Sequence, residues 1–185
     1  MSGRVAHRDA PRAQLPLLDR LIDDAPESAA DPPLSAAEAL AALRRSVQRD
    51  LEALLNARRR WSSWPAELTE LNVSAVGYGI PDFTAGALND PQRRERLRAE
   101  IEETIRRFEP RFASVRVLAL SDRDEHGSPS RGRDGSPTEP TLRLRIEAML
   151  RAEPAPEPVA FDTLVNAATA DVVLRESAER ERTHV

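Results

Sequence analysis

The segment Phe108-Glu109-Pro110-Arg111-Phe112 brings a carboxylate, a proline and a guanidinium together in a chain with few aromatic residues. The preceding pattern predicts a helix that ends here, where a carboxylate opposes the partial negative charge of a helix C-terminus. Pro110 forbids continuation and pushes Glu109 towards extended geometry, while Arg111 adds a planar charged fork. This break with local rules indicates either a functional site or a helix stop with a surface ion pair.

The residue types available argue against catalysis. The chain has no cysteine and no lysine, which excludes thiol catalysis, cysteine-based zinc sites and a lysine Schiff base. The three histidines all fall in segments expected to be irregular: His7, His126 and His184. A glycosidase would need Glu109 with Asp82, but nearby Arg111 favours the charged form of Glu109, which is the wrong state for a general acid. We therefore predict a protein that is not an enzyme and needs no cofactor or metal.

The charge pattern argues against nucleic acid and membrane as partners. The 27 basic residues, all arginine, are interleaved with 31 acidic ones for a net charge of −4, whereas a nucleic-acid binder should carry an unbalanced basic stripe. The N-terminus lacks a signal-peptide core, and no apolar run approaches the roughly 20 residues that cross a bilayer. We expect a cytoplasmic protein for protein–protein recognition, with Glu109 and Arg111 bonding a partner's groups and an exposed strand accepting another chain's strand.

Two helices are expected to position the Glu109–Arg111 segment. The first starts at Ser35, which makes a capping box with Glu38, and it fades near the arginines at 58–60. The second opens at Asn89 or Asp90, with Pro91 in its first turn. Its charged i, i+4 pairs are expected to form a solvated face: Glu102 with Arg106 and Glu103 with Arg107.

Alternating apolar residues predict strands over 115–120, 142–148, 159–165 and 171–174. Residues 61–88 are expected to be irregular, with residues 73–78 a short strand or an ordered turn. The order of elements predicts an α+β fold in which two main helices pack on a small antiparallel sheet of three to four strands, in two layers.

Flanking segments are expected to lie outside this domain, which spans residues 34–175. Residues 1–33 read as a disordered arm with a docking motif at 15–22, whose leucines bind either their own domain or a partner. Residues 122–140 read as a mobile insertion and residues 176–185 as a polar tail.

Four ordered segments, and a weaker fifth, resemble a known family. They are Leu17-Leu18-Asp19-Arg20-Leu21; Ser46-Val47 through Arg49-Asp50-Leu51-Glu52 to Leu54-Leu55-Asn56; Tyr78-Gly79-Ile80-Pro81-Asp82; Glu109-Pro110-Arg111; and Phe161-Asp162-Thr163. The set, over residues 15–175, resembles the TssE family. TssE is the small baseplate wedge component of bacterial type VI secretion and is similar to a phage baseplate protein once labelled lysozyme-like.

The resemblance implies a cytoplasmic assembly part with a fold like the linking domain of a contractile sheath subunit. It would join the wedge subunits TssF and TssG, near TssK, and would dock or prime the TssB–TssC sheath by strand exchange. The resemblance assigns contact with the sheath to Glu109, Pro110 and Arg111. It assigns binding of the wedge subunits to Leu17, Leu18, Asp19, Arg20 and Leu21. The alternatives are a peptidoglycan hydrolase, motivated by the old family label, and a generic regulatory adaptor. The 122–140 tract departs from the family pattern.

Overall fold

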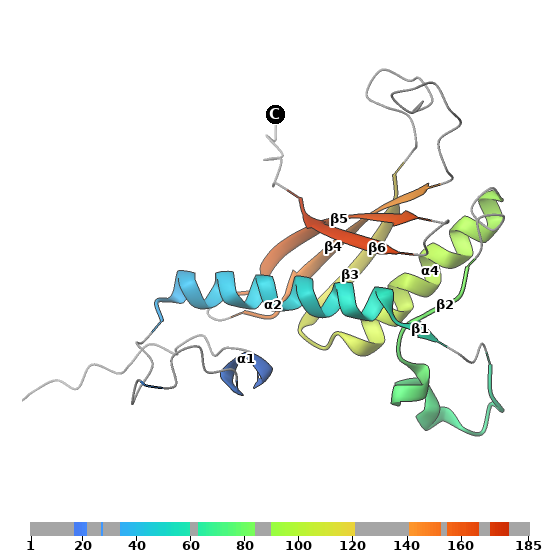
Figure 1. Ribbon diagram of the computed structural model, residues 1–185, viewed down its shortest axis with the longest axis horizontal. Helices are drawn as coiled ribbons and strands as arrows, with labels where there is room; N and C mark the ends of the chain where they lie inside the picture. The colour runs from blue at the N-terminus through green and yellow to red at the C-terminus, as the bar shows by residue number, and fades with distance from the viewer. Residues whose placement is uncertain are drawn as a thin grey trace, which may run out of the picture.

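The computed structural model of the 185-residue chain describes residues 17–21, 27, 34–59, 63–83, 90–120, 141–152, 155–166 and 171–177. Most of the expected arm at 1–33, the whole of the insertion at 122–140 and most of the tail at 176–185 lie outside these ranges. Two long helices lie on a four-stranded antiparallel sheet of order β3-β4-β5-β6, beside a separate two-stranded sheet (Figure 1). This arrangement confirms the predicted α+β fold.

Helix α2 spans Ala36–Asn56 and begins with the predicted capping box. The Ser35 N–H donates to Glu38 Oε2 at 2.8 Å, and the Glu38 N–H donates to Ser35 Oγ at 3.3 Å. The helix ends before the arginines at 58–60, because Arg58 and Arg59 leave it to form strand β1 (Arg58–Arg59). Strand β1 pairs in parallel with β2 (Ile80–Pro81), a contact that the sequence pattern did not predict.

The segment before β2 forms two short 3-10 helices, η1 (Thr69–Val73) and η2 (Ala75–Gly77), so it is an ordered turn and not a strand. Ser74 starts η2 by accepting a hydrogen bond from the Val76 N–H at 3.3 Å. Gly79 follows with a φ of 94°, and a Cβ there would lie 2.4 Å from the carbonyl oxygen of Ala57. Only glycine fits this close approach, which sets β2 beside β1.

Helix α4 spans Pro91–Phe108 and begins where the sequence predicted. Asp90 is its N-cap and accepts a hydrogen bond from the Gln92 N–H at 2.9 Å. Within the described residues no helix is both long and apolar enough to cross a membrane.

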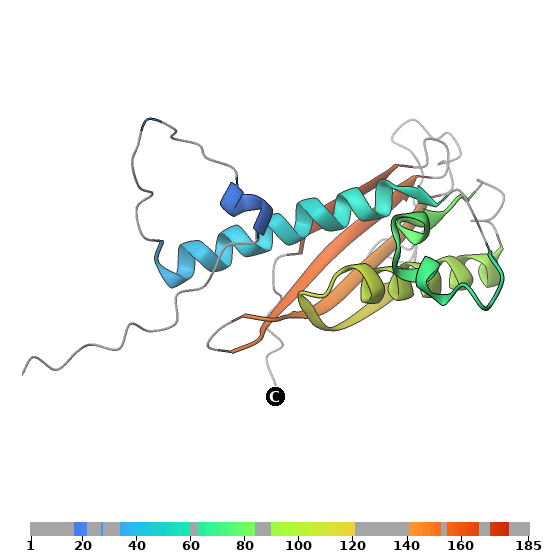
Figure 2. The same ribbon diagram turned by 90° about the horizontal axis from the view of Figure 1, so that it is seen from below.

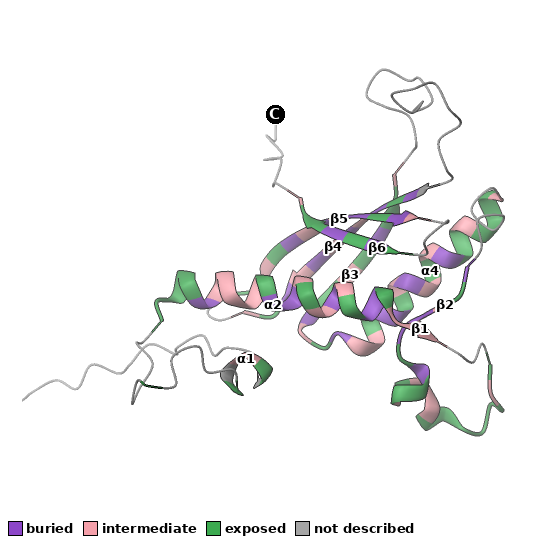
Figure 3. Ribbon diagram, viewed as in Figure 1, coloured by how far each residue is buried: buried purple, intermediate pink, exposed green. Residues whose placement is uncertain are grey.

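The main sheet consists of β3 (Phe112–Ala119), β4 (Thr141–Leu150), β5 (Glu157–Asn166) and β6 (Val172–Glu176). Burial alternates along β4 and β5 as predicted, and the buried face meets α2 and α4 (Figure 3). Strand β6 continues to Glu176, and the Ser177 N–H still donates to the Ala160 carbonyl at 2.8 Å, so this strand runs past the predicted end at residue 174. Both layers and strand β2 contribute the largest fully buried core side chains: Leu51, Leu55, Ile80, Ile101, Ile105, Leu144, Ile146, Leu150 and Phe161.

Candidate functional site

The predicted site lies at the corner where α4 ends and β3 begins. Glu109 leaves the helix with φ −116° and ψ 80°, and its N–H still donates to the Ile105 carbonyl at 2.9 Å. The Phe112 N–H then donates to the Glu109 carbonyl at 3.2 Å, which closes the turn. Glu109 is only 5% exposed, whereas Pro110 lies on the surface. The corner is therefore a fixed bend with its carboxylate inside and its proline outside.

Arg111 holds the Glu109 carboxylate on both oxygens. Arg111 Nε donates to Oε1 at 2.6 Å, Nη2 donates to Oε2, and the Arg111 backbone N–H also donates to Oε1 at 3.2 Å. These bonds are internal and Glu109 is buried, so its carboxylate offers no free hydrogen-bonding surface and serves to hold Arg111 in place. Direct contact of Glu109, Pro110 and Arg111 with a partner stays a prediction. The surface accessible to a partner belongs to Pro110 and to the exposed part of the Arg111 side chain.

The same arginine ties the corner to α2. Arg111 Nη1 donates to Ser46 Oγ at 3.2 Å, and Nη2 donates to Asp50 Oδ2 at 2.8 Å. Burial lowers the pKa of Arg111, but the bonds and negative charges of Glu109 and Asp50 raise it overall. Sequence reasoning assigned no role to Ser46 or Asp50. A hydroxyl beside the core residue Val47 was the available signal, because a buried polar group needs a partner.

An aromatic pair borders the corner. Tyr78 meets Phe108 edge to face, with ring centroids 5.3 Å apart and an interplanar angle of 75°. Burial raises the pKa of Tyr78, and the negative charges of Asp50 and Glu109 raise it further. The third and fourth segments that resemble the family, at 78–82 and 109–111, therefore lie next to each other at this corner.

Helix α1 (Leu17–Leu21) is held beside α2 by one charged residue (Figures 1 and 2). Asp19 Oδ1 accepts from Arg49 Nη1 at 2.8 Å, while Leu18 and Leu21 are 55% and 74% exposed. The side chains of Leu17 and Arg20 are not among those that the structure describes. Asp19 thus docks the motif on its own domain, and the two exposed leucines leave partner binding open as a prediction.

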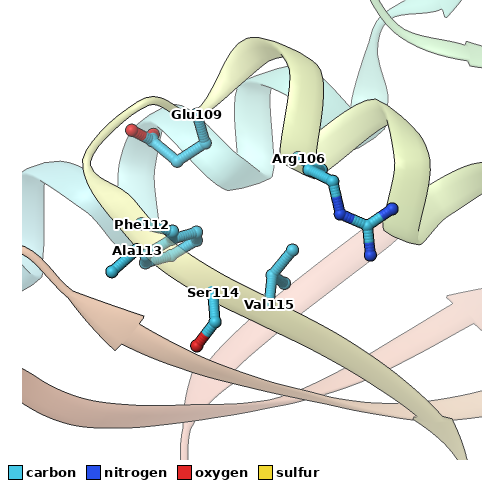
Figure 4. A pocket seen from close by; sticks show the side chains of 6 residues that line it. All are labelled: Arg106, Glu109, Phe112, Ala113, Ser114 and Val115. Atoms are coloured by element: carbon cyan, nitrogen blue, oxygen red, sulfur yellow. The ribbon is translucent and has the colours of Figure 1, made fainter.

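A pocket of about 250 Å³ lies between the end of α4 and β3 (Figure 4). Residues of the helix end and of the strand's first half line it: Arg106, Glu109, Phe112, Ala113, Ser114 and Val115. The pocket therefore borders the outer edge of β3, directly beside the corner.

Side chains of α2 close the opposite edge of the sheet, at β6. The Val172 N–H donates to Asn56 Oδ1 at 2.9 Å, and Asn56 Nδ2 donates to the Val172 carbonyl at 2.8 Å. Gln48 Nε2 donates to the Leu174 carbonyl at 3.2 Å. The outward backbone groups of an edge strand normally invite pairing by another chain, and here α2 occupies two consecutive outward positions.

The β3 edge is closed at one residue. Arg98 Nη1 donates to the Val117 carbonyl at 2.8 Å, and the Val117 N–H donates to Glu102 Oε2 at 3.0 Å. The expectation that Glu102 belongs to a solvated face is therefore wrong, because its carboxylate accepts a hydrogen bond from the backbone of β3. Outward positions alternate along an antiparallel edge strand, so the backbone groups of Val115 and Ala119 face the same side. Within the described residues no hydrogen bond closes them.

A comparison with known families matches residues 41–155 to the family described as baseplate wedge protein gp25. The matched range covers more than half of the chain. It contains the turn of helix α2 that bears Ser46 and Asp50, the α4–β3 corner and β4. Searches among curated proteins and among solved structures gave no match.

Proposed function

The chain belongs to the baseplate wedge protein gp25 family, and from that premise we propose that it is the TssE-type subunit of a type VI secretion baseplate. A structural role in the baseplate of a phage-like tail follows from the family itself. The proposal adds the setting and the partners: in the cytoplasm, on a membrane-docked baseplate, it joins TssF and TssG near TssK. There it docks or primes the TssB–TssC sheath.

The observation that carries the proposal is the fixed corner beside the open edge of β3. The N–H and C=O groups of Val115 offer two hydrogen bonds to an extended partner segment, as in strand addition. The pocket that Phe112 and Arg106 line can receive one side chain of that segment. The Glu109–Arg111 bonds hold this edge at a fixed angle to α2, so the corner determines where a sheath strand begins to pair.

The exposed leucines support wedge binding by α1. Leu18 and Leu21 lie on a short helix whose only described polar tie to the domain is Asp19. Covering an exposed apolar side chain at such a position with a partner's groove removes apolar surface from water and so stabilises the complex. In the proposed role TssF and TssG supply that groove.

The geometry does not favour the peptidoglycan hydrolase. A general acid needs a carboxyl group that carries a proton near neutral pH. Both oxygens of Glu109 instead accept hydrogen bonds from Arg111, and the residue is 5% exposed, so neither oxygen is free to reach a leaving group of a substrate. No arrangement at the corner favours hydrolysis over recognition.

Co-purification tests the proposal with two matched proline variants. In Val115→Pro the lost N–H points outward from β3, so no bond of the sheet is removed, but an incoming strand loses its donor. Glu176→Pro places the same change on an outward position of β6. Sheath subunits TssB–TssC should be captured by the unmodified chain and by Glu176→Pro, and capture should fail with Val115→Pro.

The second arm of the experiment tests the wedge contact. Replacing both Leu18 and Leu21 with aspartate should abolish capture of TssF and TssG without changing the melting temperature of the isolated chain. Capture of TssB–TssC by Val115→Pro at the level of the unmodified chain refutes the role of the β3 edge. Unchanged capture of TssF and TssG by the aspartate variant refutes the role of α1.

A further inference from the structure

One turn of α2 serves two arginines at once. Ser46, which is 2% exposed, accepts at Oγ from Arg49 Nη2 and from Arg111 Nη1, each at 3.2 Å. Asp50 accepts from Arg49 Nε at Oδ1 and from Arg111 Nη2 at Oδ2, at 3.0 and 2.8 Å. The two guanidinium groups therefore share both of their α2 acceptors.

Each of the two arginines also binds a carboxylate in one of the two candidate contact sites. Arg49 binds Asp19 of α1 at 2.8 Å, and Arg111 binds Glu109 of the corner. The result is a chain of alternating charges that runs from α1 across one turn of α2 to the corner: Asp19, Arg49, Asp50, Arg111 and Glu109.

The charges of this chain act on one another beyond direct contact. Burial raises the pKa of Asp19, but the bond from Arg49, the nearby Ser46 hydroxyl and the charges of Arg49 and Arg111 lower it overall. The field of Arg111 thus reaches Asp19, although the two residues share no hydrogen bond among the described contacts. Polar networks in a partly desolvated setting couple in this way more strongly than their separate pairs.

We propose that the Ser46–Asp50 turn couples α1 to the α4–β3 corner, with Ser46 and Asp50 as positioning residues for Arg111. When a partner takes α1 away, Arg49 loses Asp19 and turns its donors to Ser46 and Asp50. It then competes with Arg111 for these oxygens, and the hold of Arg111 on α2 loosens. The naming of α1 and the corner as contact sites rests on the proposed function. The coupling between them rests only on the hydrogen bonds.

Coupling between two sites is reciprocal in binding free energy. A partner that holds Arg111 at the corner would therefore also change how readily α1 is released. In a baseplate subunit this would couple the two contacts in sequence. Binding of a partner to α1 would loosen the hydrogen bonds of Arg111 to α2, and so change the orientation and rigidity of the corner, before a strand pairs with β3.

The arginine Nε–H signals of the 15N-labelled full chain test the coupling without any partner. Replacing Arg49, Arg111 and Arg145 with lysine one at a time assigns their signals. In Asp19→Ala the signals of both Arg49 and Arg111 should shift. The solvent exchange rate of the Arg111 Nε–H should rise about fivefold, the lower end of typical couplings. Asp19→Glu, which keeps a carboxylate acceptor, should restore most of the original signal.

Asp162→Ala is the matched control, because Arg145 Nε donates to Asp162 Oδ1 at 2.8 Å on another part of the molecule. It should move the signal of Arg145 and leave that of Arg111 in place. If Asp19→Ala moves only Arg49, with the shift and exchange rate of Arg111 unchanged, the coupling is refuted. That result would leave the proposed function standing, whereas failed capture of TssB–TssC would leave the coupling standing.

Discussion

Removal of Arg111 should destabilise the fold more than removal of Glu109, although the two residues form the same ion pair. Glu109 is 5% exposed, and the side chain of Arg111 is 24% exposed. In Arg111→Ala a buried carboxylate loses its cation, which typically costs about 3–5 kcal/mol of unfolding free energy. In Glu109→Ala the guanidinium keeps Asp50 and Ser46, so the loss should be about 1.5–3 kcal/mol, as for a hydrogen bond to a charged group.

Urea unfolding followed by circular dichroism measures this asymmetry. The double variant, in which neither charge remains, should be more stable than Arg111→Ala alone, so the two single effects should not add. Arg106→Ala is the control on the same helix, because its side chain is 53% exposed and pairs with Glu102 and Glu103. Its cost should stay within about 1 kcal/mol.

Two outcomes would refute the reasoning: a larger loss for Glu109→Ala than for Arg111→Ala, or additive losses in the double variant. The asymmetry also changes how the site has to be tested. Glu109→Ala is the direct way to test whether the corner contacts a partner. Because Glu109 is an internal bond acceptor, a partner lost in that variant is not separable from lost stability, and Val115 is the cleaner probe.

Three further outcomes follow from the described contacts. Gly79→Ala should lower the unfolding free energy by more than about 2 kcal/mol, measured from the urea midpoint, because the φ of 94° and the carbonyl of Ala57 leave no room for a Cβ. Glu102→Ala should self-associate in sedimentation equilibrium, since it frees the Val117 N–H on the β3 edge; Glu103→Ala should sediment like the unmodified chain. The bond from Arg145 lowers the pKa of Asp162 below its ordinary value of 3.8, so this pair stabilises the fold above that value and loses its effect as the pH falls through the lowered pKa. The stability difference between the unmodified chain and Asp162→Asn, measured by urea unfolding across pH, should therefore be largest near neutrality and shrink below pH 3.8.

Local rules made the helix starts and the strand faces predictable. Ser35 with Glu38, and Asp90 with Pro91, each satisfy a helix N-terminus within a few residues, so the sequence alone determines those boundaries. Apolar and polar residues alternate along 142–148 and 159–165, and this pattern predicts the buried face of each strand as soon as one side of the sheet is covered. The same rules identified Glu109 as anomalous, because a carboxylate at a helix C-terminus needs a compensating cation.

Long-range pairing was beyond the sequence. Asn56 and Val172 lie 116 residues apart, and Arg111 and Asp50 lie 61 apart. No periodicity links such positions, since each contact depends on how the helices settle on the finished sheet. For the same reason the departure of Arg58 and Arg59 into β1 was missed: a strand of two residues carries no alternation to detect.

The closed position at Val172 of β6 and the one at Val117 of β3 differ in how easily a partner strand can displace the side chains that close them. At β6 Asn56 uses its amide oxygen and nitrogen on Val172, and displacement leaves the oxygen without its partner. At β3 Glu102 also accepts from Arg106 at 2.7 Å, and Arg98 also donates to Glu95 at 2.8 Å. These charged groups keep other partners when Val117 is taken from them, so the unmade-bond penalty is smaller. Strand addition at β3 therefore costs less than at β6, and it can pass Val117 once pairing has begun at Val115.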